Sequence, residues 1–204
     1  MILRKLAELC IGLVIMFSLI IFSGTAVKAS EPVLYGAENA AEDKELTLED
    51  ILRYSLESQY LKRSIDNGIF NSFGKVKPYQ EMERYSGTGI SELEILFLKR
   101  GYKIPEDKSS KYFKAATDFK TNLEYSYNNE IKNIIMYEMF LKQDLPDDVR
   151  VVLEALRLRG NQDLKAIEAS LDEINGINME NTVDDNIVTR FFNWLGRSFD
   201  DMIH

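Results

Sequence analysis

Apolar residues recur at steps of three and four along three long segments of the chain, and this period is typical of amphipathic helices. The segments span residues 78–100, 110–142 and 146–174. Each stripe is interrupted near its middle by a carboxylate, a small residue or a polar one, where an ordinary helical core would have Leu or Ile. The interrupting residues are Ser86 and Gly89 in the first segment, Glu130 in the second, and Gly160 and Asp163 in the third.

A further helix precedes these three. Thr47 stands three residues before Asp50, a capping-box spacing, and the pattern continues to about Ser72 before Gly74. Gly176 follows the last stripe as a C-terminal stop. No strand-like alternation or tandem repeat occurs, so we expect an all-α fold. Short connections favour an up-down four-helix bundle over residues 47–175.

Gly87 and Gly89 lie inside the helical pattern of residues 78–100. Each glycine costs a helix interior about 1 kcal/mol relative to alanine. We therefore expect a kink or break here, with Ser91 capping a new helix in the sequence "SELE". The alternative is that the glycines allow a neighbouring helix to approach closely.

The N-terminal residues have the pattern of a secretory signal. Arg4 and Lys5 precede an uncharged run over residues 9–27, and small residues follow it. We expect residues 1–29 to be a signal peptide cleaved between Ala29 and Ser30, which makes the protein secreted or otherwise extracytoplasmic. An uncleaved membrane anchor is the alternative, because the run is close to the roughly 20 residues that span a bilayer. Residues 30–46 are polar and are expected to form a flexible linker.

Composition excludes several kinds of site. Removal of the signal takes away three basic residues and one acidic residue, which changes the formal net charge from −8 to −10. Such a chain lacks the basic surface that nucleic-acid binding needs. Cys10 is the single cysteine and leaves with the signal, and His204 is the single histidine. Catalytic triads and zinc sites of the usual type are therefore excluded.

Several phrases resemble an uncharacterised bacterial ferritin-like family, over roughly residues 47–170. They are "SLESQYLKRSI…FNSFGKVKPYQEM", "ELEILFLKRGYKIPED", "NNEIKNIIMYEMFL" and "PDDVRVVLEALRLRGNQDLKAIE". The resemblance implies a helical bundle with a metal centre at mid-height, built from Glu and Glu-x-x-His residues. In this chain most of the implied ligands are replaced. The corresponding positions are Gln59, Ser86, Gly89, Glu130 and Asp163.

This departure implies a divergent member with a degenerate metal site and no cofactor. We expect an exported, non-enzymatic domain that acts as an interaction or ligand-binding module. The alternative is a metal-binding oxidase or storage protein that uses a reduced carboxylate site, and a small-ligand carrier is a third possibility. The expected partner is a protein or a small ligand, not nucleic acid, and a homodimer is left open. Membrane contact would come only through an uncleaved N-terminal segment.

Glu130 and Asp163 are the charged residues that most need explanation. Buried acids must be paired, so we expect an ammonium, a guanidinium or water beside them; an unpaired carboxylate would shift its pKa and neutralise. The alternative is a residual oxygen-ligand site with Gln59 for a hard cation. The tyrosines at 125, 127 and 137 are interpreted as core residues with wet hydroxyl groups rather than redox groups.

Residues 176–204 are expected to form a linker and an amphipathic helix. Ile187, Phe191, Trp194 and Phe199 can share one face of that helix. It is expected to dock on the bundle, and the alternative is a helix for a partner or a membrane surface; its two basic residues, Arg190 and Arg197, weaken the membrane alternative.

Overall fold

The computed structural model describes residues 34–176, apart from the side chains of residues 81 and 83–86. Within this range the chain forms five α-helices and one short 3-10 helix, and it has no strand, which confirms the all-α prediction. None of the helices in this range is long and apolar enough to cross a membrane. The predicted signal peptide and the predicted C-terminal helix lie outside the described residues.

Local sequence signals set most helix ends. Helix α3 (Leu48–Phe73) begins with the predicted capping box, in which Thr47 Oγ1 accepts a hydrogen bond from the Asp50 backbone N–H and the Asp50 side chain accepts one from the Thr47 N–H. Helix α6 (Asp147–Asn175) ends at Gly176, whose φ of 69° is left-handed. Both ends agree with the sequence prediction.

Helix α5 (Phe119–Phe140) starts later than the pattern over residues 110–142 predicts. Asp118 caps it by accepting hydrogen bonds from the backbone and hydroxyl of Thr121, both at 2.8 Å. The preceding residues form only the short 3-10 helix η1 (Ser109–Lys111). The local cap therefore overrides the apolar spacing before it.

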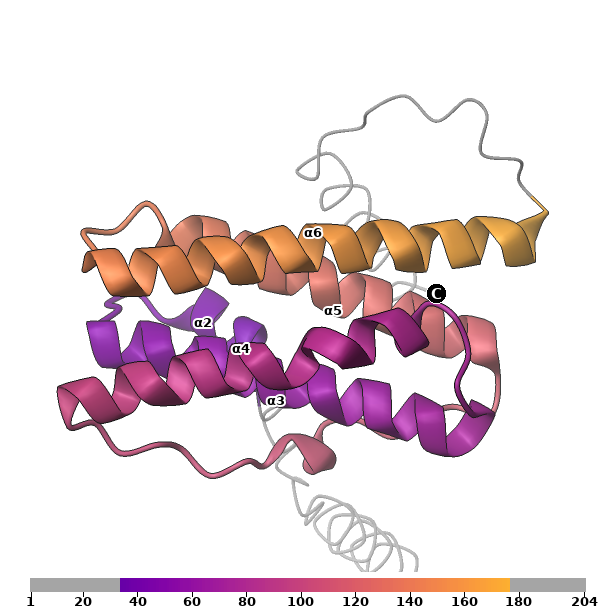
Figure 1. Cartoon of the computed structure of the whole chain (residues 1–204), viewed down its shortest axis with the longest axis horizontal. Coiled ribbons are helices and arrows are strands. Elements are labelled where there is room, and N and C mark those ends of the chain that lie inside the picture. The colour runs from indigo at the N-terminus through magenta and orange to yellow at the C-terminus, as the bar shows by residue number, and fades with distance from the viewer. Residues whose placement is uncertain (1–33, 177–204) are drawn as a thin grey trace, which may run out of the picture. The chain divides into compact units, whose positions relative to one another are not determined.

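The four long helices lie side by side, with α3 against α4 (Tyr79–Arg100) and α5 against α6 (Figure 1). Tyr79, at the start of α4, donates or accepts a 2.6 Å hydrogen bond with Ser126 in the first half of α5. Its ring also packs on Phe119, the first residue of α5. Helices α4 and α5 therefore start at the same end and run in the same direction.

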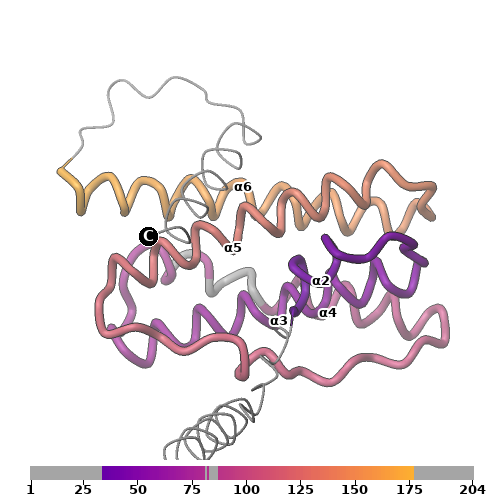
Figure 2. The backbone as a smooth tube through the Cα atoms, turned by 180° about the vertical axis from the view of Figure 1, so that it is seen from behind, coloured from indigo at the N-terminus to yellow at the C-terminus, as the bar shows by residue number. Residues whose placement is uncertain are grey.

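The connection between α4 and α5 explains this direction. It leaves α4 at one end and returns along the outside of α3 to the other end (Figure 2). Arg63 in α3 contacts Asp107 in this connection, and Gly68 faces Phe113. The up-down order expected from short connections is therefore wrong at this step, because residues 101–118 form a long crossover.

Residues 34–46 are packed on the helices, so the prediction of a flexible linker is wrong for them. They contain helix α2 (Ala37–Glu42), and Ala40 is fully buried. Tyr35 stacks on Tyr112 with ring centroids 4.4 Å apart. The Gly36 N–H donates to Glu57 of α3 at 3.2 Å. The stacked rings of Tyr35 and Tyr112 and the buried Ala40 supply apolar contact that the polar composition of residues 30–46 does not indicate.

Helix α4 is continuous through both glycines, so the predicted break is wrong. Ser91 Oγ donates to the Gly87 carbonyl one turn earlier and does not cap a new helix. The alternative of a close approach holds at Gly89, where an added Cβ would lie 2.8 Å from both Gln59 Oε1 and Leu156 Cδ2. Gly87 faces open space.

The apolar core is divided along the length of the helices. The larger cluster joins the start of α3 to the end of α4, and a second cluster joins the end of α3 to the start of α4. Buried polar and charged side chains lie on α3 and α5 along this core; they include Gln59, Lys62, Asp66 and Glu130. This polar layer is the part of the fold with chemistry to explain.

Candidate functional site: a buried ion cluster

Three helices contribute the polar side chains at the centre of this layer. Gln59 and Lys62 come from α3, Glu130 comes from α5, and Asp163 comes from α6. These side chains line a small cavity of about 20 Å³, together with Met82, Leu156, Arg159 and Gly160. A cavity of this size has room for about one water molecule.

The Lys62 ammonium is the centre of the cluster. Its Nζ lies 2.8 Å from Glu130 Oε1 and 3.1 Å from Asp163 Oδ2. Asp66, one turn further along α3, has its Oδ2 3.9 Å from the same Nζ. Lys62, Asp66 and Glu130 are each more than nine-tenths buried, and Asp163 is half-buried. One cation therefore joins carboxylates from three helices.

Electrostatics keep this ammonium charged. Burial by itself lowers the pKa of Lys62, but the carboxylates of Asp66, Glu130 and Asp163 outweigh that effect and hold its pKa well above the ordinary value. Burial also raises the pKa of Glu130; Lys62 opposes this rise and Asp163 adds to it. Burial and the charges of the cluster therefore act together on the protonation of Glu130, and the Lys62 ammonium is the group that favours its ionised form.

Gln59 is held at the edge of the cluster by two close contacts. Its Nε2 donates to the Tyr137 hydroxyl at 2.9 Å. Its Oε1 lies against the bare backbone of Gly89. On the opposite side, an added Cβ at Gly160 would lie 3.3 Å from Glu130 Oε2 and 3.1 Å from Ile134 Cγ1. Two glycines therefore make room for the amide and the carboxylate.

The structure brings together four of the five positions singled out by the resemblance: Gln59, Gly89, Glu130 and Asp163. The fifth, Ser86, is among the residues whose side chains are not described. The two acids have an ammonium between them, one of the three partners expected from the sequence. Gln59 and Gly89 contact each other directly, which the pattern of each helix alone does not show.

Lys62 and Asp66 are the members that the sequence analysis missed. Lys62 follows Gln59 by three residues and Asp66 follows Lys62 by four, so all three share one face of α3. A lysine on the apolar face of a helix, with acids that need a partner expected in the same core, was the available signal.

The groups present do not fit the metal centre that the resemblance implies. Glu130 Oε1 and Asp163 Oδ2 lie 2.8 Å and 3.1 Å from the Lys62 ammonium, whose positive charge would repel a second cation. Within residues 34–176 no group of three or more His, Cys, Asp or Glu side chains is arranged to hold a metal ion. The hard-cation site with Gln59 is disfavoured for the same reason.

The three tyrosines of α5 differ in their surroundings. Tyr137 is buried and bonded to Gln59, and burial raises the pKa of its hydroxyl. Tyr125 is exposed, and its hydroxyl donates to the Tyr112 carbonyl at 3.4 Å. Tyr127 packs against the second apolar cluster. These contacts are those of packing residues with bonded or wet hydroxyl groups.

No family model matches the chain, and no curated protein matches it. Among solved structures, the fold is similar to that of the hypothetical protein MJ0754 from Methanococcus jannaschii DSM 2661, with a TM-score of 0.56. The two chains are 14% identical, and the match covers 70% of this chain and 90% of the other. At this identity the similarity concerns the fold alone.

Proposed function

We propose that this chain is an exported, non-enzymatic ferritin-like domain that acts as an interaction or ligand-binding module. In this domain a lysine ammonium takes the place of the metal centre. The observation that carries the proposal is the position of Lys62 Nζ, 2.8 Å from Glu130 and 3.1 Å from Asp163. A permanent, tethered cation supplies the positive charge that these acids need.

The ferritin-like part of the proposal rests on the topology of the chain and on the position of the polar layer along the helices. Ferritin-like four-helix bundles have one long crossover connection and build their sites from inward-facing side chains on all four helices. Residues 101–118 give this chain a crossover of that kind. Gln59, Gly89, Glu130 and Asp163 come from the four long helices and meet between the ends of the core.

The chemistry of the cluster supports the non-enzymatic part of the proposal. An amine acts as a nucleophile or a base only when it loses its proton, and the raised pKa of Lys62 opposes that loss. Its carboxylate partners are occupied by the same ammonium. The cluster is therefore suited to holding helices α3, α5 and α6 together rather than to turning over a substrate.

Metal analysis of the purified full chain tests this proposal. We expect iron, manganese and zinc well below one equivalent, both in the wild type and in Glu130→Gln. Near-stoichiometric iron in the wild type that disappears in Glu130→Gln would contradict the proposal. That result would favour the alternative of a metal-binding oxidase or storage protein with a reduced carboxylate site.

Export is tested separately by amino-terminal sequencing of the protein recovered from cells that make it. We expect the mature chain to begin near Ser30. Retention of Met1 would favour an N-terminal membrane anchor, without changing the conclusion about the ion cluster.

A further inference from the structure

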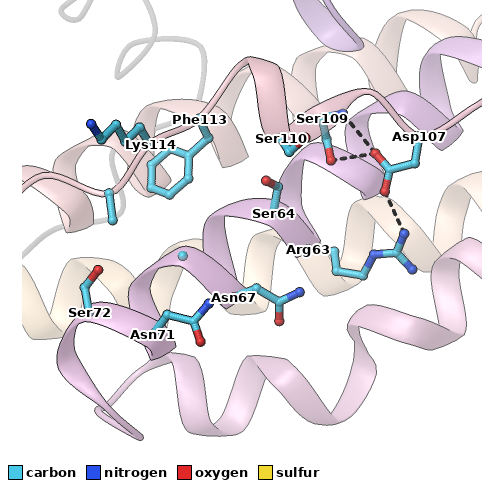
Figure 3. Close-up of a pocket in the computed structure, with 12 residues that line it drawn as sticks. Arg63, Ser64, Asn67, Asn71, Ser72, Asp107, Ser109, Ser110, Phe113 and Lys114 are labelled. Atoms are coloured by element: carbon cyan, nitrogen blue, oxygen red, sulfur yellow. Dashed lines mark hydrogen bonds and ion pairs between the residues drawn. The ribbon is translucent and has the colours of Figure 1, made fainter.

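A second cavity, far more open than the ion cluster, lies between α3 and the crossover (Figure 3). Its volume is about 500 Å³, within the range of roughly 300–1,000 Å³ that is common for small-molecule sites. One wall is a face of α3 over residues 63–72, and the other wall is the segment over residues 107–115. We call this cavity the crossover groove.

One end of the crossover groove is fixed by an ion pair. Asp107 accepts hydrogen bonds from the Ser109 backbone at 2.9 Å, the Ser109 hydroxyl at 2.6 Å and Arg63 Nη2 at 2.8 Å. Burial alone would raise the pKa of Asp107, but these bonds lower it below its ordinary value. The Arg63 guanidinium also lies over the ring of Tyr60. Both charged groups are therefore held in place before any ligand arrives.

The other end is shaped by an aromatic ring. Phe113 approaches Gly68 so closely that an added Cβ would lie 2.8 Å from its Cε1 atom. The same ring packs on Tyr125 with centroids 5.0 Å apart. Gly68 thus allows the crossover to lie against α3, and the ring forms an apolar wall of the groove.

Between these ends the wall of α3 is lined by neutral polar groups. Asn67 and Asn71 are exposed and stand one helical turn apart on the same face (Figure 3). The hydroxyls of Ser64, Ser72 and Ser110 open onto the same space. Within residues 34–176 none of these five side chains forms a hydrogen bond with another protein group. Each amide and hydroxyl offers both a donor and an acceptor to a ligand.

We propose that the crossover groove binds a neutral, polyhydroxylated ligand of the class of short saccharides. Such a ligand presents hydroxyl groups that both donate and accept, and ring faces of C–H groups that can pack on Phe113. Among the lining charges, Arg63 is already paired with Asp107, whose carboxylate would repel an anion, whereas Lys114 supplies an exposed ammonium that would attract one. The neutral class is favoured because the five amide and hydroxyl side chains carry no charge, and the anionic probes test the alternative. This inference rests on the proposed function as a ligand-binding module, since it assigns that module a site and a ligand class.

Isothermal titration calorimetry of the full chain tests the assignment. The neutral probes are maltotriose and triacetylchitotriose, and the anionic probes are inorganic phosphate and trigalacturonate. The test variant is the double substitution Asn67→Ala/Asn71→Ala, which places two good helix formers at exposed positions and should fold. The matched control is Gln162→Ala, which removes an exposed side-chain amide from α6 outside the groove.

We expect at least one neutral trisaccharide to bind saturably, with a Kd near or below about 1 mM. The double substitution should weaken that binding by about tenfold or more, because two ligand hydrogen bonds are lost, whereas Gln162→Ala should leave it unchanged. Absence of saturable binding by both neutral probes would overturn the assignment. Binding of the anionic probes alone, or neutral binding that the double substitution does not weaken, would overturn it too. Metal content of the same preparation tests the proposed function independently.

Discussion

Replacement of Lys62 by Met is the most direct test of the ion cluster, because it removes the charge while keeping a side chain of similar length. The change leaves Glu130 and Asp163 without the ammonium that lies 2.8 and 3.1 Å from them. Removing one partner of a buried ion pair typically costs about 3–5 kcal/mol. We expect a loss of that size in the free energy of unfolding at pH 8.

The loss should depend on pH, and its sign follows from proton binding. Burial already raises the pKa of Glu130 in the wild type, and without Lys62 only the side chain of Asn133 still opposes that rise. The folded variant then binds more protons than the unfolded chain from about pH 4.3, the ordinary value for Glu, up to the folded pKa. Its unfolding free energy therefore falls as the pH rises through this window. The destabilisation should be smaller at pH 5 than at pH 8.

Urea unfolding of the full chain, followed by far-ultraviolet circular dichroism at pH 5 and pH 8, measures both effects. Lys99→Met is the matched control, because Lys99 is exposed and its Nζ lies 3.8 Å from Asp148 Oδ2. This variant should change the free energy of unfolding by about 0–1 kcal/mol. The double variant Lys62→Met/Glu130→Gln should recover part of the loss. A cost below about 1 kcal/mol at pH 8, equal to that at pH 5, would refute the idea that this ammonium supports the core.

Four further substitutions probe the structure by the same urea assay. Gly89→Ala should destabilise the protein by about 1–3 kcal/mol because its Cβ would meet Gln59 and Leu156. Gly87→Ala, where the Cβ would face open space, should stabilise it by roughly 0.5–1 kcal/mol. Equal effects of the two substitutions would argue against the close approach at Gly89. Thr47→Ala removes the cap of α3 and should cost about 1 kcal/mol, and an unchanged midpoint would contradict its role. Glu130→Gln removes a carboxylate with a raised pKa, whose contribution lowers the free energy of unfolding as the pH rises above about 4.3. The pH profile of the variant should lack this contribution, and an identical profile would count against the shift.

Local signals predicted the four long helices and the need for a partner beside the acids in the core. Thr47 and Gly176 mark helix ends through contacts with residues three or four positions away, and such contacts depend little on the rest of the chain. Glu130 and Asp163 stand out because they occupy stripe positions that are otherwise apolar. Their burial follows from the period of the helix, and a buried carboxylate needs a partner.

Which partner they have could be decided only by the tertiary structure. Lys62 reaches Glu130 and Asp163 because α3, α5 and α6 adopt one relative rotation and register, and these are set by packing across the bundle. The same applies to Gly89, which keeps α4 continuous while Gln59 approaches its backbone.

The crossover and the packing of α2 were likewise beyond a local reading of the sequence. The sequence of residues 101–118 does not indicate which way this segment runs. Its path depends on contacts between distant residues, such as that of Arg63 with Asp107. Residues 34–46 look like a linker in composition, yet Tyr35 and Ala40 bury apolar surface on helices distant in the chain. The sequence alone therefore determined where the four long helices form and that the acids in the core need a partner. Only the tertiary structure decided which group is that partner and which path the chain takes, because both depend on contacts between residues that are distant in the sequence.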